Sequence, residues 1–385
     1  MDYANTILFE AFDHPKLPLS NRIIMAPCTR MMAEDQTISK ESAAYYRRRA
    51  EGGMGLIVTE ATTIDHDASS AHSLAPAIHG EKSLSGWRHV VDEVHDAGGK
   101  IAPQLWHVGA TRVAENGPNP DVPAVSPSGF LSPGVKSGVA ITESGIADVV
   151  SAYAKAAADA KAVGFDSIEI HGAHGYLIDS FFWDEVNLRD DQYGGPLENR
   201  IRMAVEVIAA IREAVGEDFP IIFRHSQWKS GHYDFKVAKT PQEVELWLGP
   251  LSDAGVDIFH ASMRRFWLPE FEESHLNLAG WVKKIIGKPT IAVGSVGLDK
   301  DYSGQSIDAP EETSKKSADR SGDRYAHYSE FTGLERLVGM MEKGEFDLIA
   351  VGRASLAEPY WPNKVREGKT DEIAPYTKDV LKELY

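Results

Sequence analysis

Two histidines and a tyrosine, His171, His174 and Tyr176, lie within six residues of one another. They follow the short apolar stretch 167–170, which predicts a buried strand. Residues three apart point to opposite faces of a regular strand, so the two imidazoles converge only if the chain turns after it. Gly172 and Gly175 permit that turn. Two imidazoles and a phenol gathered at a strand end can polarise an oxygen atom and deliver a proton, which is general acid chemistry.

Two other interpretations of these histidines stay open. Histidines near strand ends often have only a structural role. The spacing His-x-x-His can also bring two ring nitrogens to one metal ion, with Asp166 and Glu169 as nearby carboxylates. However, Glu169 belongs to the expected strand and should point away from the turn, and no third ligand stands at a telling spacing. The sequence therefore predicts no metal site.

The composition is that of a globular protein. Of 385 residues, 43% are hydrophobic and 25% are charged. Asp and Glu total 57 against 40 Lys and Arg, which gives a formal net charge of −17. So acidic a surface repels phosphate backbones and anionic lipid headgroups, so neither nucleic acid nor a membrane is an expected partner.

Cysteine content and the N-terminal sequence exclude further classes of protein. A single cysteine, Cys28, excludes an internal disulfide, a Cys-rich zinc site and an iron–sulfur cluster. No basic segment followed by an apolar stretch opens the sequence, and no apolar run approaches the roughly 20 residues of a membrane span. These features predict a cytoplasmic protein.

Eight short apolar runs, most followed by an amphipathic stretch, predict repeated βα units. The expected strands are 22–26, 55–60, 100–105, 167–171, 220–224, 257–261, 289–293 and 347–351. The expected helices are 42–52, 83–97, 145–162, 197–215, 240–254, 278–286 and 331–343. Eight consecutive units favour a single α/β domain over residues 1–385, folded as a (β/α)8 TIM barrel.

Two segments interrupt the repeat. Residues 107–142 follow the third expected strand, are rich in Pro, Gly and Ser, and show no helical period. Residues 298–328 follow the seventh strand and are polar. Both insertions fall after the carboxyl ends of strands, where barrels of this class place their chemistry. We expect the first to be a lid; the second is either a mobile excursion or a tolerated surface insertion.

Four motifs carry a resemblance to a known family. They are HGAHGYLIDSFFWDEVNLRDDQYGGPLENR at 171–200, APCTRM at 26–31, PQLWH at 103–107 and VGRA at 351–354. In this order, and across essentially the whole chain, the sequence resembles the old yellow enzyme family of FMN-dependent ene-reductases. The resemblance implies a barrel that holds FMN tightly and non-covalently at its carboxyl face.

The resemblance also implies a reaction. NADH or NADPH reduces the flavin, and flavin N5 then returns hydride to an activated C=C bond in a ping-pong cycle. The implied substrates are small electrophilic alkenes, namely enones, enals, maleimides and nitroalkenes, including xenobiotic nitro compounds. His171 and His174 match the pair that binds the substrate's electron-withdrawing oxygen, Tyr176 matches the proton donor, and Trp106 lines the substrate pocket.

The same resemblance assigns a set of cofactor residues. Thr29 would bond the flavin O4 region, Gln104 the pyrimidine edge and Arg224 the N1–O2 edge, while Ala61 permits close approach of the backbone. The phosphate would lie between the loops after the seventh and eighth strands. The full set is Pro27, Thr29, Ala61, Gln104, Arg224, Gly294, Ser295, Gly352 and Arg353.

The sequence departs from the family pattern in two places and leaves two alternative functions open. The segment 263–271 is unusually aromatic, and the insertion at 298–328 is longer than the family pattern suggests. Both leave the substrate open. One alternative is an oxidative flavoenzyme of the same family that demethylates an amine; another is a flavin-free, metal-dependent barrel hydrolase. The sequence leaves the oligomeric state undetermined.

Overall fold

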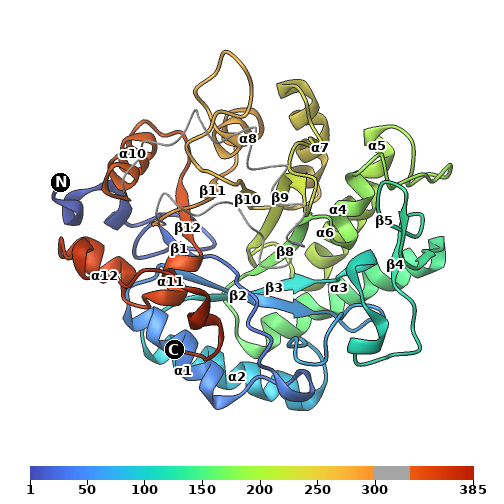
Figure 1. The fold of residues 1–385 in the computed structure, drawn as a ribbon, viewed down its shortest axis with the longest axis horizontal. Coiled ribbons are helices and arrows are strands. Elements are labelled where there is room, and N and C mark those ends of the chain that lie inside the picture. Colours follow the sequence, from blue (N-terminus) through green and yellow to red (C-terminus); the bar gives the residue numbers. More distant parts are fainter. Residues whose placement is uncertain (298–329) are drawn as a thin grey trace.

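Eight parallel strands form a closed barrel in the computed structural model, which describes residues 1–297 and 330–385, apart from the side chains of 330–332 (Figure 1). Their order around the barrel is β1-β12-β11-β10-β9-β8-β3-β2. The barrel strands are β1 (Ile23–Met25), β2 (Leu56–Thr63), β3 (Ile101–Trp106), β8 (Ile168–His174), β9 (Ile221–Lys229), β10 (Ile258–Ser262), β11 (Thr290–Val293) and β12 (Leu348–Val351). The predicted TIM barrel and all eight predicted strands are confirmed.

Alternation along the strands builds two apolar layers. Ile24, Leu56 and Ile222 belong to a cluster inside the barrel, while their neighbours Ile23 and Ile57 belong to the larger cluster that packs against the helices. Strands buried on both faces read as continuous apolar runs, which is why these short runs were visible in the sequence.

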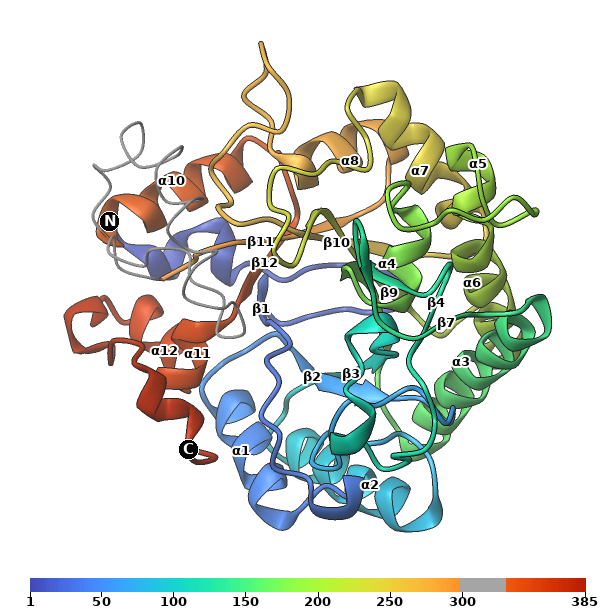
Figure 2. The ribbon, with the colours of Figure 1, turned by 45° about the vertical axis from the view of Figure 1, so that its right-hand side comes forward.

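Helices surround the strands as a ring (Figure 2). They are α1 (Lys40–Glu51), α2 (Glu81–Asp96), α3 (Glu143–Val163), α4 (Leu177–Phe182), α5 (Leu197–Arg200), α6 (Arg202–Val215), α7 (Pro241–Asp253), α8 (Leu278–Ile286), α10 (Glu330–Glu342), α11 (Arg353–Ala357) and α12 (Trp361–Arg366). Short 3-10 turns lie at Tyr3–Asn5, Ile7–Phe9, Glu34–Gln36, Gly109–Thr111, Ala114–Asn116, Thr370–Glu372 and Lys378–Leu381.

Local capping explains where several helices begin. Thr240 and Glu243 form a reciprocal capping box at the start of α7, and the Asn277 side chain accepts the backbone N–H of Gly280 at the start of α8. One expected helix, 197–215, is wrong as a single element, because it divides into α5 and α6 at Ile201.

The amino-terminal end of the barrel is closed by apolar and polar contacts. Phe12 and Leu19, paired across a short antiparallel bridge, pack into the interior cluster. The same arrangement occurs at three places around them. An aspartate that precedes one strand accepts the first backbone N–H of a neighbouring strand and forms an ion pair with a lysine. The aspartates are Asp166, Asp257 and Asp347, and their lysines are Lys100, Lys16 and Lys283. This repeated arrangement indicates a stabilising role for that end.

The opposite end carries the first insertion. Between β3 and α3 the chain forms β4 (Val125–Ser126) paired with β7 (Val139–Ala140), and a small antiparallel pair of β5 (Phe130–Ser132) and β6 (Val135–Lys136). No helix longer than a 3-10 turn occurs in 107–142, as expected. The second predicted insertion, 298–328, lies outside the described residues.

Candidate active site

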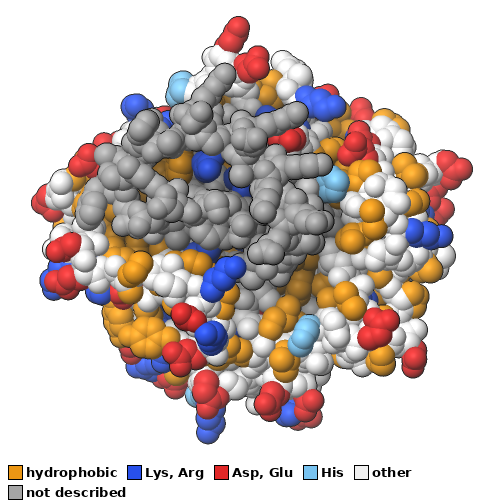
Figure 3. All heavy atoms as spheres, viewed as in Figure 1, with side chains coloured by type: hydrophobic (Ala, Val, Ile, Leu, Met, Phe, Trp, Pro, Cys, Tyr) orange, Lys and Arg blue, Asp and Glu red, His pale blue; other side chains and the backbone are white. Residues whose placement is uncertain are grey.

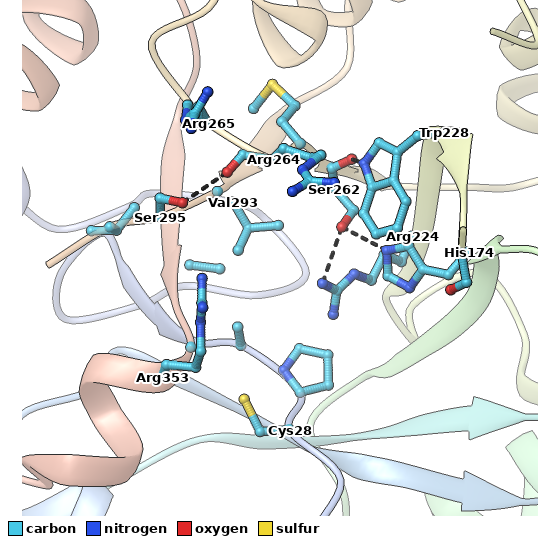
Figure 4. Close-up of a pocket in the computed structure, with 18 of the residues that line it drawn as sticks. Cys28, His174, Arg224, Trp228, Ser262, Arg264, Arg265, Val293, Ser295 and Arg353 are labelled. Atoms are coloured by element: carbon cyan, nitrogen blue, oxygen red, sulfur yellow. Dashed lines mark hydrogen bonds between the residues drawn. The ribbon is translucent and has the colours of Figure 1, made fainter. Parts of the chain in front are cut away.

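A cavity of about 380 Å³ opens at the carboxyl ends of the strands, within the range of small-molecule sites (Figure 4). Eight of the predicted site residues line it: Pro27, His174, Tyr176, Arg224, Gly294, Ser295, Gly352 and Arg353. They come from the loops after β1, β8, β11 and β12, from the last residue of β8 and from within β9. Segments far apart in the sequence therefore meet at one site.

The histidine and tyrosine side chains converge as expected. The ring centroids of His171 and His174 are 5.1 Å apart, and those of His171 and Tyr176 are 4.9 Å apart, both nearly perpendicular. Trp106 packs edge-on against Tyr176 at 5.1 Å. All four predicted substrate-contacting residues thus form one aromatic cluster.

The turn that brings the two imidazoles together differs from the sequence prediction. The strand continues through His174, and a register shift against β9 between Gly172 and His174 redirects the second imidazole. His174 itself has a positive φ of 67°, followed by Gly175 at 87°. Gly172 serves close packing instead, because a Cβ there would lie 2.2 Å from the Phe223 ring.

Burial keeps both imidazoles neutral. It is the largest cause that lowers the pKa of His171 and of His174 well below the usual value, and the nearby positive charge of Arg224 lowers both further. A neutral imidazole has one N–H donor and one acceptor nitrogen. Each ring can therefore donate one hydrogen bond without carrying a charge.

Three neighbours hold His174. Its Nε2 lies 2.8 Å from Ser262 Oγ, its backbone N–H donates to Ser226 Oγ at 3.0 Å, and its ring stacks on Trp228 with centroids 4.5 Å apart. Sequence reasoning missed Trp228 and Ser262. Both lie just beyond predicted strands, at the carboxyl end, which is the signal that would have drawn attention to them.

Arg224 is a buried cation at the floor of the cavity, with 8% of its surface exposed. Its Nη2 donates to Ser262 Oγ at 3.3 Å. Burial lowers its pKa, while the carboxylate of Glu169 opposes that shift. Among the described residues, nothing accepts a hydrogen bond from its Nε.

Gln104 belongs to a buried network inside the barrel. Its Nε2 donates to Glu169 Oε1 at 2.8 Å, and Glu169 Oε2 lies 2.5 Å from His260 Nδ1. Glu169, which the sequence predicts to point away from the turn, points into the barrel, where His260 lowers its pKa against the effect of burial.

Five predicted residues do not line the cavity: Thr29, Ala61, Gln104, Trp106 and His171. Thr29 is exposed, whereas the other four are buried. Ala61 packs with Trp106 in a small apolar cluster that Tyr176 joins. Cys28, beside Thr29, does line the cavity, and burial raises the pKa of its thiol.

The other end of the cavity is formed by Gly294, Ser295, Gly352 and Arg353. Gly294 cannot carry a side chain, because a Cβ would lie 2.6 Å from the carbonyl oxygen of Met263. Ser295 has a positive φ of 56°, and its hydroxyl donates to the carbonyl oxygen of Arg264 at 2.8 Å (Figure 4). The two predicted phosphate loops therefore meet.

The cavity is cationic although the protein is acidic. Among its described lining residues there is no Asp or Glu. Four arginines line it: Arg224, Arg264, Arg265 and Arg353. Lys and Arg side chains also show near the centre of the face drawn in Figure 3, while acidic side chains lie mostly toward its rim. Such a cavity favours an anionic ligand.

These residues fit FMN. The cations and the backbone turn at Ser295 suit a phosphate. His171 Nδ1, Trp106 Nε1 and Arg224 Nε are buried, and none has a hydrogen-bond partner within the described chain. Unpaired buried polar atoms are costly, and a polar ligand bound beside these residues would offer them hydrogen-bond partners. Within the described residues, no three His, Cys, Asp or Glu side chains form a metal-binding group, and no helix is long and apolar enough to cross a membrane.

Comparisons with known proteins identify the family to which the chain belongs. The model of the NADH:flavin oxidoreductase / NADH oxidase family matches residues 7–312. NADH oxidase from Thermoanaerobacter brockii is 32% identical over 370 residues, covering 93% of this chain and 50% of the relative. 12-oxophytodienoate reductase 1 from Oryza sativa subsp. japonica is 38% identical over 207 residues, covering 52% of this chain and 54% of the relative. The chain spans about half the length of these curated relatives.

Solved structures of similar fold cover nearly all of the chain. Morphinone reductase in complex with tetrahydroNAD has a TM-score of 0.78 at 25% identity, covering 98% of this chain and 94% of that one. Old Yellow Enzyme from Pichia sp. AKU4542 has the same TM-score and identity, with 98% and 90% covered. The chain therefore belongs to the NADH:flavin oxidoreductase / NADH oxidase family, the family of old yellow enzyme, with FMN and a reduced nicotinamide as its cofactors.

Proposed function

We propose that this chain reduces the C=C bond of small alkenes activated by a carbonyl or nitro group, with NADH or NADPH as the electron donor. Enones, enals, maleimides and nitroalkenes are the substrate classes. Bound FMN would supply the hydride transfer from the nicotinamide to the β carbon of the alkene. The protein's own residues must bind the activating group, supply a proton and exclude water.

His171 and His174 bind the activating oxygen in this proposal. Negative charge develops on that oxygen as hydride arrives, so fixed N–H donors bind the transition state more strongly than the substrate. Both rings are neutral and held by packing, so little reorganisation is needed. Removing one such donor costs about 3 kcal/mol of transition-state stabilisation.

Tyr176 is the proposed proton donor to the α carbon. It lines the cavity beside His171, and the edge-on contact with Trp106 fixes the plane of its ring. A phenol held in this way delivers a proton only where the substrate is already oriented by the two imidazoles, which couples binding to protonation.

The cofactor residues divide by chemistry. Arg224 favours negative charge at the pyrimidine end of the ring, and Gly294, Ser295, Gly352 and Arg353 hold the phosphate. A carboxylate only accepts hydrogen bonds, so the Gln104 atom that faces Glu169 is the amide nitrogen, which leaves the amide oxygen as an acceptor for the flavin edge. Pro27, Thr29 and Ala61 complete the proposed binding set.

Residues 107–142 are the proposed lid. The segment begins where β3 ends, and the backbone N–H of Leu177 donates to the carbonyl of His107 at 3.2 Å. This bond ties the start of the segment to the residue after Tyr176. A cover at this position would keep water from the reacting atoms.

The convergence of His171, His174 and Tyr176 at a cavity with Arg224 at its floor carries the proposal. Anaerobic stopped-flow mixing of the FMN-loaded chain tests it. NADH or NADPH should bleach the flavin absorbance, and cyclohexenone or a maleimide should then restore it.

Two results would contradict the proposal. A flavin that is bleached but never reoxidised by any alkene, together with turnover of an N-methylated amine, would indicate the oxidative alternative. A chain that takes up no FMN would contradict both ene-reduction and the oxidative alternative.

A further inference from the structure

Ser262 is the last residue of β10 and is not one of the proposed catalytic, substrate-binding or cofactor-binding residues. Its side chain is 4% exposed, and its Oγ lies between His174 Nε2 at 2.8 Å and Arg224 Nη2 at 3.3 Å (Figure 4). Its carbonyl oxygen accepts a hydrogen bond from Trp228 Nε1 at 3.1 Å, which fixes the backbone at that point. The serine hydroxyl thus bridges a cation and a neutral imidazole.

Charge fixes the direction of the first of these hydrogen bonds and favours one direction for the second. A guanidinium only donates, so Ser262 Oγ accepts from Arg224. The hydroxyl dipole then turns its oxygen toward the cation and its hydrogen away from it, toward His174 Nε2. In the neutral ring, a nitrogen that accepts a hydrogen bond carries no proton, so the ring proton of His174 lies on Nδ1.

The ring orientation is fixed by other contacts. Trp228 stacks on one face of His174, with an angle of 24° between the planes, and Ser226 holds its backbone N–H. Nδ1 makes no hydrogen bond to a described residue, while His174 lines the cavity. An Nδ1–H is therefore the donor that this imidazole can offer to a ligand.

We propose that Ser262 is a positioning residue that fixes His174 as the Nδ1–H tautomer, so that the imidazole donates to the activating oxygen of the substrate. The donation to a substrate oxygen rests on the proposed function, whereas the tautomer itself does not. Without the serine hydroxyl, Nε2 would lose its donor, and the ring would populate the Nε2–H form, in which Nδ1 repels a developing oxyanion.

Nitrogen NMR of the FMN-loaded protein, labelled with ¹⁵N-histidine, tests the tautomer directly. Subtracting the spectrum of His174→Gln identifies the His174 signals. In the wild type we expect a protonated, pyrrole-type Nδ1 and an unprotonated, pyridine-type Nε2. Ser262→Ala should shift both signals toward the other tautomer, and Ser262→Thr, which keeps the hydroxyl, should restore the wild-type pattern.

Ser230→Ala is the matched control, since the Ser230 side chain lines the same cavity without a hydrogen bond to His174, and the substitution keeps the backbone N–H that donates to the His174 carbonyl at 3.3 Å. Its His174 signals should equal those of the wild type. A second readout is affinity for a phenol, whose oxygen resembles the developing oxyanion. Ser262→Ala should weaken phenol binding roughly tenfold, the loss expected for one hydrogen bond, and Ser262→Thr should recover it.

A wild-type His174 protonated at Nε2, or a tautomer unchanged in Ser262→Ala, would overturn the proposal. Failure of the proposed function would look different. A wild type with the expected tautomer that neither binds phenols nor reduces alkenes would support the role of Ser262 in the ring and contradict ene-reduction alone.

Discussion

Lys229 and Asp179 form an ion pair in which neither side chain is exposed, with Nζ 2.5 Å from Oδ1. The other carboxylate oxygen of Asp179 accepts the backbone N–H of Gly175 at 2.7 Å. Lys229 ends β9 and pairs with His174 in the register of β8 and β9. The ion pair therefore ties the end of β9 to the turn that presents His174 and Tyr176.

Lys229→Met should destabilise the protein strongly. It leaves the Asp179 carboxylate buried and unpaired, which costs about 3–5 kcal/mol. The double variant Lys229→Met/Asp179→Asn should regain much of that loss, because no buried charge remains. Urea unfolding of the FMN-free chain measures both. Lys382→Met, whose partner Asp379 is exposed, serves as the control and should unfold like the wild type. A Lys229→Met variant as stable as the wild type would contradict the account of this pair.

Tyr176→Phe should separate the two half-reactions. Bleaching of the flavin by NADH or NADPH should keep its rate, because no proton from Tyr176 is needed there. Reoxidation by cyclohexenone should slow by about a hundredfold, the scale of one general acid. Stopped-flow absorbance measures each step, and Tyr360→Phe, a partly exposed residue outside the cavity, is the control. Equal losses in both steps would argue against Tyr176 as the proton donor.

Arg224→Met should weaken FMN binding by about tenfold or more, since a charge-assisted hydrogen bond is lost, and should make the flavin potential more negative. Fluorescence titration with FMN and anaerobic redox titration provide the measurements. Arg212→Met is the matched control. Arg212 is also buried, but it pairs with Asp257 at the amino-terminal end of the barrel. Arg212→Met should lower thermal stability and leave FMN affinity unchanged. Loss of FMN affinity in Arg212→Met but not in Arg224→Met would refute the placement of Arg224 beside the flavin.

Glu60 should make stability depend on pH. Burial raises its pKa to about 7, although its Oε2 accepts the backbone N–H of Arg30 at 2.8 Å. The folded chain therefore holds this proton more tightly than the unfolded chain, whose glutamate has the ordinary value near 4.5. Its contribution to stability is complete below pH 4.5 and is lost as the pH rises through 7.

Glu60→Gln removes that titration while keeping an oxygen acceptor for Arg30. The unfolding temperature of the wild type, measured relative to Glu60→Gln, should fall between pH 5 and pH 7.5 and then level off. Glu34→Gln, in an exposed 3-10 turn, is the control. A difference that does not change with pH, or that grows as the pH rises, would contradict the raised pKa.

Local patterns in the sequence were sufficient to predict the barrel. Apolar runs such as 289–293 correspond to strands because a parallel strand is buried on both faces. Glycines such as Gly164 and Gly287 end helices with a left-handed residue. The division of 197–215 at Ile201 left no comparable trace, since no glycine or proline marks it.

The sequence also determined which residue types reach the carboxyl face, since strand ends and their order along the chain put His171, Tyr176, Arg224 and Arg353 on one side of the barrel. Only the tertiary structure decided their partners. The bulge that turns His174, its bond to Ser262 88 residues away, and the ion pair of Lys229 with Asp179 50 residues away all depend on register between strands and on packing. Contacts between residues so distant in the chain exist only once the barrel has closed, because local propensity carries no information about which neighbour a side chain will meet.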